Sequence, residues 1–144
     1  MRYAAIVLVV PLLVSAASAT SGSLDYKPGK WKTTTTMSIP MLPQPHVKTS
    51  TECVTEGDYS ADRIMEGMQG QPGCTVGTPV VSRNTLRWNI SCTMPEGSAT
   101  GSGEFTIDRD GEHGRGTVEI SVHASGQSMT TTMRLETERI GDCQ

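Results

Sequence analysis

Thioether and imidazole side chains are the first candidates for chemistry in this chain. Beyond the first residue, methionine occurs at seven positions: Met37, Met41, Met65, Met68, Met94, Met129 and Met133. Soft thioether sulfurs bind Cu(I), and Met41 and His46 stand close together in one proline-rich stretch. This pair is the candidate soft-metal site. Flexible filling of gaps in an apolar core is the alternative that explains most of the other methionines.

Histidines and carboxylates could serve as a general base or as calcium ligands. The histidines are His46, His113 and His123, and three acids alternate in one turn, Asp108, Asp110 and Glu112. A general base needs an orienting group and a nucleophile nearby, and the sequence places neither beside a histidine. A calcium loop needs a further carboxylate at fixed spacing, and none follows this turn. We therefore expect surface histidines, a solvated turn, no cofactor and no enzymatic activity.

Four cysteines predict a disulfide framework: Cys53, Cys74, Cys92 and Cys143. No two lie closer than 18 residues, so a Cys-x-x-Cys redox or metal motif is absent. In a small exported chain such cysteines predict two disulfides. We expect Cys74 to join Cys92, which leaves Cys53 for Cys143, and the two other pairings stay open.

Three of the few aromatic residues could shape a binding pocket. Trp31, Trp88 and Phe105 fall in predicted strands, and small curled sheets offer an apolar pocket at the mouth. These are the candidate ligand-binding residues, and ordinary core packing is the alternative. Gly101 and Gly103 share the parity of Phe105, which leaves room for a bulky ring or permits a bend in the sheet.

The elements that must position these residues are strands. β-branched residues between closely spaced turn residues predict strands at 30–39, 47–54, 74–81, 86–93, 99–107, 116–124 and 127–139. The stretch 40–45 holds three prolines, which lack an amide donor, and is therefore a loop. The fold class is mainly β: an antiparallel meander of about seven strands, as a curled sheet or small barrel, with one short helix in a crossover.

Two turns predict how neighbouring strands pair. A turn centred on Arg83 would pair Val80 with Leu86 and bring Cys74 opposite Cys92. A later two-residue turn, Ser125-Gly126, keeps the apolar side apolar by these pairs: Val122 with Met129, Ile120 with Thr131 and Val118 with Met133.

The segment from Thr55 to Gly73 interrupts the strands. Ser60 as a cap and apolar residues at helical spacing (Ile64, Met65 and Met68) predict about two turns of helix there. If Cys53 joins Cys143, the second and last predicted strands point the same way, so this segment is a parallel crossover. The first strand then runs antiparallel to the last.

Residues 1–19 have the three parts of a signal peptide. Met1-Arg2-Tyr3 is a short cationic start, an apolar run follows, and Ala17-Ser18-Ala19 is a small-x-small site with cleavage expected after Ala19. The run is too short for a membrane span, and Thr20 rather than Cys after the cut argues against a lipid anchor. We expect residues 20–144 to form one disulfide-stapled domain in the periplasm or secreted.

Charge excludes one class of partner. After residue 19 the chain has 11 Lys and Arg against 15 Asp and Glu, and its cations are spread along the sequence. Such a chain has no electrostatic footprint for nucleic acid. The leading hypothesis is a non-enzymatic exported binding or envelope-associated domain, with a small hydrophobic ligand or an envelope component as partner. A periplasmic copper-binding protein and an uncharacterised enzyme are the alternatives.

Several short motifs carry a resemblance to a known family. They are Pro28-Gly29-Lys30-Trp31 before a threonine-rich strand, Cys53-Val54-Thr55, Gly73-Cys74, Trp88 with Cys92, Gly101-Ser102-Gly103 and Arg139-Ile140-Gly141-Asp142-Cys143. In order and spacing the chain resembles the domain-of-unknown-function family 3617, over nearly all of the mature part. Lys30 and Glu138 depart from the family's pattern. The resemblance implies a small, exported, β-rich bacterial protein and assigns no catalytic residue.

Overall fold

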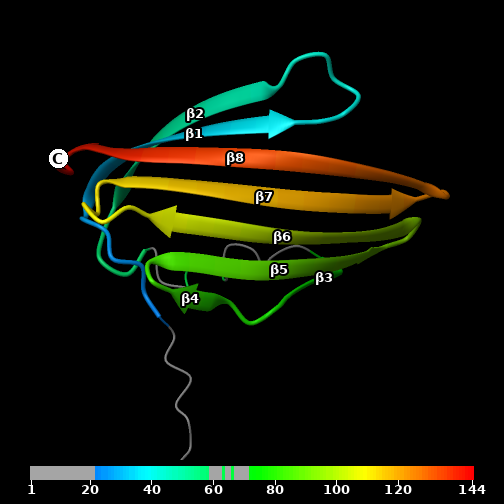
Figure 1. Ribbon diagram of the computed structural model, residues 1–144, viewed down its shortest axis with the longest axis horizontal. Coiled ribbons are helices and arrows are strands. Elements are labelled where there is room, and N and C mark those ends of the chain that lie inside the picture. The colour runs from blue at the N-terminus through cyan, green and yellow to red at the C-terminus, as the bar shows by residue number, and fades with distance from the viewer. Residues whose placement is uncertain (1–21, 59–62, 64–65, 67–71) are drawn as a thin grey trace, which may run out of the picture.

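The computed structural model describes residues 22–58, 63, 66 and 72–144. Its strands are β1 (Gly29–Ser38), β2 (His46–Val54), β3 (Cys74–Val76), β4 (Val80–Ser82), β5 (Thr85–Met94), β6 (Gly97–Ile107), β7 (His113–Ala124) and β8 (Gln127–Gly141). They form one antiparallel sheet in the order β2-β1-β8-β7-β6-β5-β3, with β4 also paired to β5 (Figure 1). The mainly β, antiparallel prediction is confirmed.

The sheet is open and curled rather than closed into a barrel. Among the strands that the structure describes, β2 and β3 stand at opposite edges and do not pair with each other. Glu52 of β2 and Leu86 of β5 nevertheless line the same pocket, although β1, β8, β7 and β6 lie between those two strands in the sheet. The right-handed twist that accumulates from strand to strand brings such distant strands toward one another.

The described residues form eight strands because the predicted strand 74–81 is broken in two. Val76 pairs with Ile90, whereas Val81 pairs with Leu86, so the register shifts by one residue between β3 and β4. Pro79 lies in the break and has no amide proton to give to the sheet. The predicted pairing of Val80 with Leu86 is therefore wrong.

The two predicted hairpin turns differ in how well their registers were anticipated. The β4–β5 turn uses two residues, Arg83 and Asn84, with φ of 48° and 66°, instead of being centred on Arg83 alone. The β7–β8 turn is the predicted Ser125-Gly126, with φ of 51° and 76°. All three predicted pairs across β7 and β8 are confirmed: Val122 with Met129, Ile120 with Thr131 and Val118 with Met133.

Both expected disulfides are present. Cys74 and Cys92 are direct cross-strand neighbours with Cα atoms 3.9 Å apart, and the Cα atoms of Cys53 and Cys143 are 5.7 Å apart. β2 and β8 point the same way, as predicted, and β1 lies between them, antiparallel to both. The bridge from Cys53 to Cys143 thus ties the ends of β2 and β8 together beside the start of β1.

Two predicted elements fall mostly outside the described residues. The signal peptide at 1–19 lies wholly outside them, and of the predicted helix in the crossover only Arg63 and Glu66 are described. The crossover segment joins β2 at one edge of the sheet to β3 at the other. Within the part of the chain that the structure describes, no helix has the length and hydrophobicity needed to cross a membrane.

The hydrophobic core lies at one end of the sheet, where β1 and β5 begin and β6 ends (left in Figure 1). Its buried members are Leu24, Trp31, Val54, Leu86, Phe105 and Ile107. The segment before β1 covers this end, and Asn84 fastens it by donating from Nδ2 to the carbonyls of Asp25 at 3.1 Å and Ile107 at 2.9 Å. The core therefore closes one end of the curled sheet.

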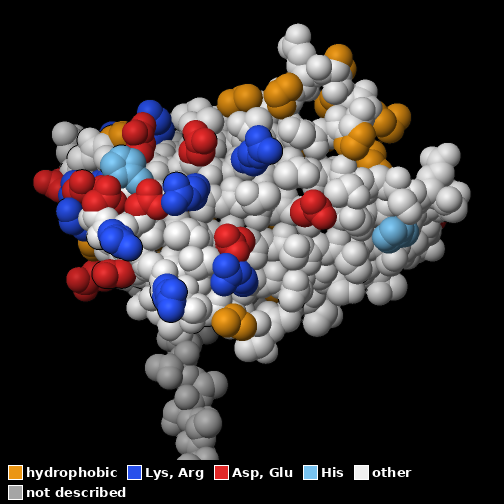
Figure 2. Space-filling model, in the orientation of Figure 1, with side chains coloured by type: hydrophobic (Ala, Val, Ile, Leu, Met, Phe, Trp, Pro, Cys, Tyr) orange, Lys and Arg blue, Asp and Glu red, His pale blue; other side chains and the backbone are white. Residues whose placement is uncertain are grey.

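Strand alternation gives the two faces of the sheet opposite chemistry. We call concave the face that holds the core and the pocket, with Trp31, Thr33, Met37, Leu86, Trp88, Phe105, Val118, Ile120, Val122, Met133, Leu135 and Thr137. The opposite parity is polar, with ion pairs such as Arg87 Nε to Glu104 Oε2 at 2.6 Å. Figure 2 shows one face of the molecule, with most charged side chains toward the left end of the view and apolar ones gathered at the β1–β2 hairpin and its loop.

Candidate functional site

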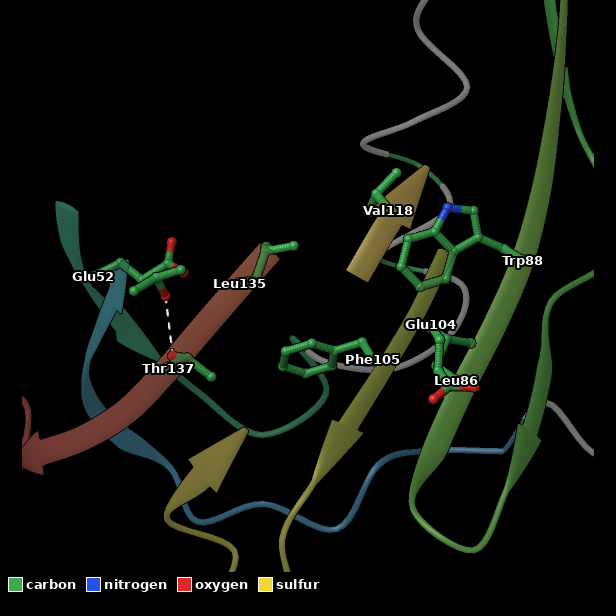
Figure 3. A pocket seen from close by; sticks show the side chains of 9 residues that line it. Glu52, Leu86, Trp88, Glu104, Phe105, Val118, Leu135 and Thr137 are labelled. Carbon is green, nitrogen blue, oxygen red and sulfur yellow. Dashed lines mark hydrogen bonds between the residues drawn. The ribbon is translucent and has the colours of Figure 1, made fainter. Parts of the chain in front are cut away.

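A pocket of about 250 Å³ lies on the concave face beside the core (Figure 3). It is lined by Thr33, Glu52, Leu86, Trp88, Glu104, Phe105, Val118, Leu135 and Thr137. These residues come from β1, β2, β5, β6, β7 and β8, so the pocket exists only because the sheet curls. Its wall is mostly apolar, which suits a ligand that water solvates poorly.

Trp88 forms one wall of the pocket by lying across β6. A Cβ built on Gly103 would stand 2.1 Å from Cζ2 of the Trp88 indole, so no side chain fits between the ring and the strand. Phe105 lies against β7 in a similar way, because a Cβ on Gly116 would stand 2.9 Å from its Cδ2. The room predicted beside Gly103 is confirmed, and the ring that uses it is that of Trp88.

The few polar groups of the pocket gather on the β1, β2 and β8 side. Thr137 is buried, with 5% exposure, and its hydroxyl shares a 3.0 Å hydrogen bond with the hydroxyl of Thr33, the dashed line in Figure 3. Glu52, exposed on the edge strand β2, adds a carboxylate on the same side. The pocket therefore has an apolar wall of β5, β6 and β7 residues and one polar margin.

The apolar surface continues beyond the pocket toward the end of the sheet opposite the core. Cross-strand pairing places Val118 beside Met133, Ile120 beside Gly101, and Val122 beside Ala99. Val118, Ile120, Val122 and Met133 are each half-buried. A ligand longer than the pocket would find further apolar contacts along this face.

A family model described as "Protein of unknown function (DUF3617)" matches residues 26–143. The chain belongs to the DUF3617 family. The resemblance inferred from the short motifs is thereby confirmed, and the match covers all eight strands. Comparisons with curated proteins and with solved structures find no match.

The three aromatic residues predicted to bind a ligand occupy different places in this DUF3617 domain. Trp88 and Phe105 line the pocket, whereas Trp31 is fully buried in the core and donates from Nε1 to the Lys27 carbonyl at 3.0 Å. Sequence reasoning missed the other pocket residues: Thr33, Glu52, Leu86, Glu104, Val118, Leu135 and Thr137. Strand parity was the available signal for most of them, but parity does not reveal which distant strands face each other.

The predicted soft-metal pair lies at the tip of the β1–β2 hairpin. Met41 is 81% exposed in the loop between the strands, and His46 is the first residue of β2. The cross-strand neighbour of His46 is Met37 on β1 rather than Met41. The pairing of Met41 with His46 as metal ligands stays a prediction.

The acidic turn sends its carboxylates to separate partners. Asp108 pairs with Arg115 at 3.2 Å, Asp110 with His113 at 2.8 Å and Glu112 with Lys27 at 3.0 Å. Among the residues that the structure describes, no group of three or more His, Cys, Asp or Glu side chains could hold a metal ion. Ion pairs with residues of β7 and with Lys27 of the segment before β1 thus hold this turn.

Asp110 and His113 shift each other's pKa in this turn. Hydrogen bonds from the Glu112 amide and from the His113 side chain lower the pKa of the Asp110 carboxyl. In return, the hydrogen bond and the negative charge of Asp110 raise the pKa of His113. Both groups are exposed, so the pair is a surface feature on the polar side of the fold.

Proposed function

We propose that this DUF3617 protein is a non-enzymatic, exported domain that binds a small hydrophobic ligand on its concave face. The observation that carries the proposal is the half-open pocket of about 250 Å³, walled by Leu86, Trp88, Phe105, Val118 and Leu135. The apolar side chains around the pocket stay in contact with water while it is empty. Burying them would stabilise the protein, because each buried CH₂ contributes about 0.8 kcal/mol. A ligand that fills the pocket recovers that free energy.

The lining favours an amphiphile with a short apolar part. The volume lies just below the range of about 300–1,000 Å³ that is typical of sites for drug-sized ligands. The hydroxyls of Thr33 and Thr137 and the carboxylate of Glu52 offer hydrogen bonds at one margin only. We therefore propose a single acyl chain or a compact aromatic, with a hydrogen-bonding group directed toward β1 and β2.

A non-enzymatic role is supported by the chemistry of the lining. Among the described residues, those that line the pocket include no histidine, lysine or cysteine, so this part of the wall lacks the usual pairing of a nucleophile with a base. Of the two described glutamates in the lining, Glu52 presents its carboxylate at the polar margin, whereas the side chain of Glu104 pairs with Arg87 on the opposite face of the sheet. Binding without chemistry fits this composition.

Export and contact with the cell envelope form the second part of the proposal. The signal-like residues 1–19 support secretion to the periplasm, and two disulfides fit an oxidising compartment. The β1–β2 loop supports contact with an apolar surface, since Met41 and Leu42 at its tip are 81% and 52% exposed. The exposed apolar side chains at this loop are visible in Figure 2.

Binding of N-phenylnaphthylamine and of dodecanoate tests the pocket. We expect both probes to bind, to change the emission of Trp88 and to raise the melting temperature. At a probe concentration of 100 times the Kd, the free energy of unfolding should rise by about 2.7 kcal/mol. Val118→Phe fills the pocket and should weaken binding roughly tenfold or more. Its matched control is the neighbouring Glu119→Gln on the polar face, which should bind as wild type. Equal affinity of Val118→Phe and wild type, or no binding of either probe, would refute the proposal.

A further inference from the structure

Three soft or borderline metal ligands lie side by side on the concave face, at the end of the sheet away from the core. His46 of β2 is the direct cross-strand partner of Met37 on β1, and Met37 is in turn the partner of Met133 on β8. Side chains of directly opposed residues point to the same face, with Cβ atoms about 4.5–5.5 Å apart. One imidazole and two thioethers therefore share a single row across three strands.

This donor set matches one class of metal ion. Thioether sulfur is a soft ligand that selects Cu(I), imidazole binds copper readily, and neither side chain brings a negative charge that would favour Zn²⁺ or Ca²⁺. Met37 and Met133 are half-buried, which keeps water from competing for the sulfur atoms, whereas His46 is exposed at the sheet edge and gives the ion a way in. Methionine is flexible enough to close around an ion without moving the strands.

His46 differs from the other two histidines, each of which has its Nδ1 engaged by a neighbouring side chain. His113 Nδ1 lies 2.8 Å from Asp110 Oδ2, and His123 Nδ1 lies 2.7 Å from Ser128 Oγ. Within the described part of the chain, the imidazole of His46 has no hydrogen-bond partner. Both of its nitrogen atoms are therefore open to the solvent and to a metal.

We propose that Met37, Met133 and His46 bind one Cu(I) ion at the open end of the concave face. The site differs from the pair Met41 and His46 that the sequence suggested, because Met41 lies out in the loop while Met37 and Met133 are fixed by strand pairing. It does not depend on the hydrophobic ligand proposed above. Met94 and Met129 do not form a second site of this kind, because the cross-strand partner of Met94 is Gly97 and that of Met129 is Val122.

Competition for Cu(I) with the chromophoric chelator bicinchoninate tests this site. The full mature chain, oxidised and free of thiols, is titrated anaerobically with Cu(I) supplied as its tetrakis(acetonitrile) complex. We expect wild type to withdraw one equivalent of Cu(I) from the chelator. Met37→Leu, Met133→Leu and His46→Phe should each lower the affinity for Cu(I) by about tenfold or more. Replacing a residue that only supports a metal ligand already lowers metal affinity by about 10–100-fold, so removing a ligand should cost at least as much.

Matched methionine variants separate ligation from general effects. Met129 lies on the same strand and face as Met133 but has no histidine in its cross-strand row, so Met129→Leu controls for the loss of a methionine on this face. Met41→Leu removes the thioether of the β1–β2 loop. Both should bind Cu(I) as wild type, and Leu conserves volume so that each variant folds. No withdrawal of Cu(I) by wild type would overturn the proposal. An equal loss in Met129→Leu, or a loss in Met41→Leu with none in Met37→Leu, would also overturn it.

Discussion

The indole of Trp88 lies flat against the backbone of Gly103, where an added Cβ would stand 2.1 Å from ring atom Cζ2. Gly103 is the cross-strand partner of Trp88, so the ring covers its own neighbour in the sheet and reaches toward Val118 on β7. This contact sets the shape of the pocket, because a side chain at 103 would lift the ring into the space that a ligand would fill.

Gly103→Ala is expected to destabilise the protein and to move Trp88. Overpacking of this kind typically costs about 1–3 kcal/mol, and the displaced indole should become more exposed, with a red-shifted emission. Urea unfolding followed by circular dichroism measures the free energy, and the emission maximum reports on the ring. Gly77→Ala is the control, because a Cβ at 77 meets its nearest neighbour at 3.7 Å. Equal effects of the two substitutions would show that Trp88 does not depend on the bare backbone at 103.

The two disulfides should contribute unequally to stability. Cys53 and Cys143 are 90 residues apart in sequence, and Cys74 and Cys92 only 18. A disulfide stabilises the folded protein by restricting the unfolded chain, and the effect grows with the length of the loop that it closes. By this account a bridge that closes a loop of about 100 residues contributes about 4.7 kcal/mol, and one that closes about 15 residues contributes about 3 kcal/mol. Replacing both cysteines of the long-range bridge by serine should therefore lower the free energy of unfolding by roughly 1–2 kcal/mol more than the same change at Cys74 and Cys92. A larger loss from the short bridge would contradict this ranking.

Local sequence predicted the strands well and the pocket poorly, for one physical reason. Alternation and turn residues act over a few positions, so the β7–β8 hairpin follows directly from Ser125-Gly126. The pairing of Met37 with Met133 joins residues far apart in the chain, and no local signal states that register. The curl of the sheet is likewise a sum of small twists over many strands, which the sequence does not express at any single position.

The error at the β4–β5 hairpin shows where local reasoning fails. Asn84 in a left-handed conformation extends the turn to two residues, and its side chain is held there by bonds to Asp25 and Ile107, far away in sequence. The extra turn residue shifts the pairing of β4 with β5 by one position. The break at Pro79 between β3 and β4 restores the predicted register, so that Cys74 lies opposite Cys92. Tertiary contacts of Asn84 thus decide a detail that looked local.

Stability should depend on pH through the turn that holds Asp110 and His113. The pKa of Asp110 is lowered from 3.8 in the folded protein, so its contribution is present above pH 3.8 and is lost as the pH falls through the folded pKa. The pKa of His113 is raised from 6.5, so its contribution is present below pH 6.5 and is lost as the pH rises through the folded pKa. The difference in melting temperature between wild type and His113→Gln should therefore be greatest between these limits. A difference that stays constant from acid to alkaline pH would show that the ion pair contributes nothing.

The loop at the tip of the β1–β2 hairpin should mediate contact with lipid. Met41, Leu42 and Val47 are 81%, 52% and 56% exposed, and the chain from 33 to 51 contains no Asp or Glu but does contain Lys48. Apolar tips with a nearby cation suit an anionic bilayer, where about 0.8 kcal/mol is gained per buried CH₂. Leu42→Asp should therefore lower co-sedimentation with vesicles of phosphatidylethanolamine and phosphatidylglycerol. Because residue 42 is exposed, the free energy of unfolding should change by no more than about 0.5 kcal/mol. Val80→Asp, at a residue with 59% exposure on β4, is the matched control and should sediment as wild type. If both variants bind the vesicles equally, the loop has no part in membrane contact, and its exposed methionine and leucine need another explanation.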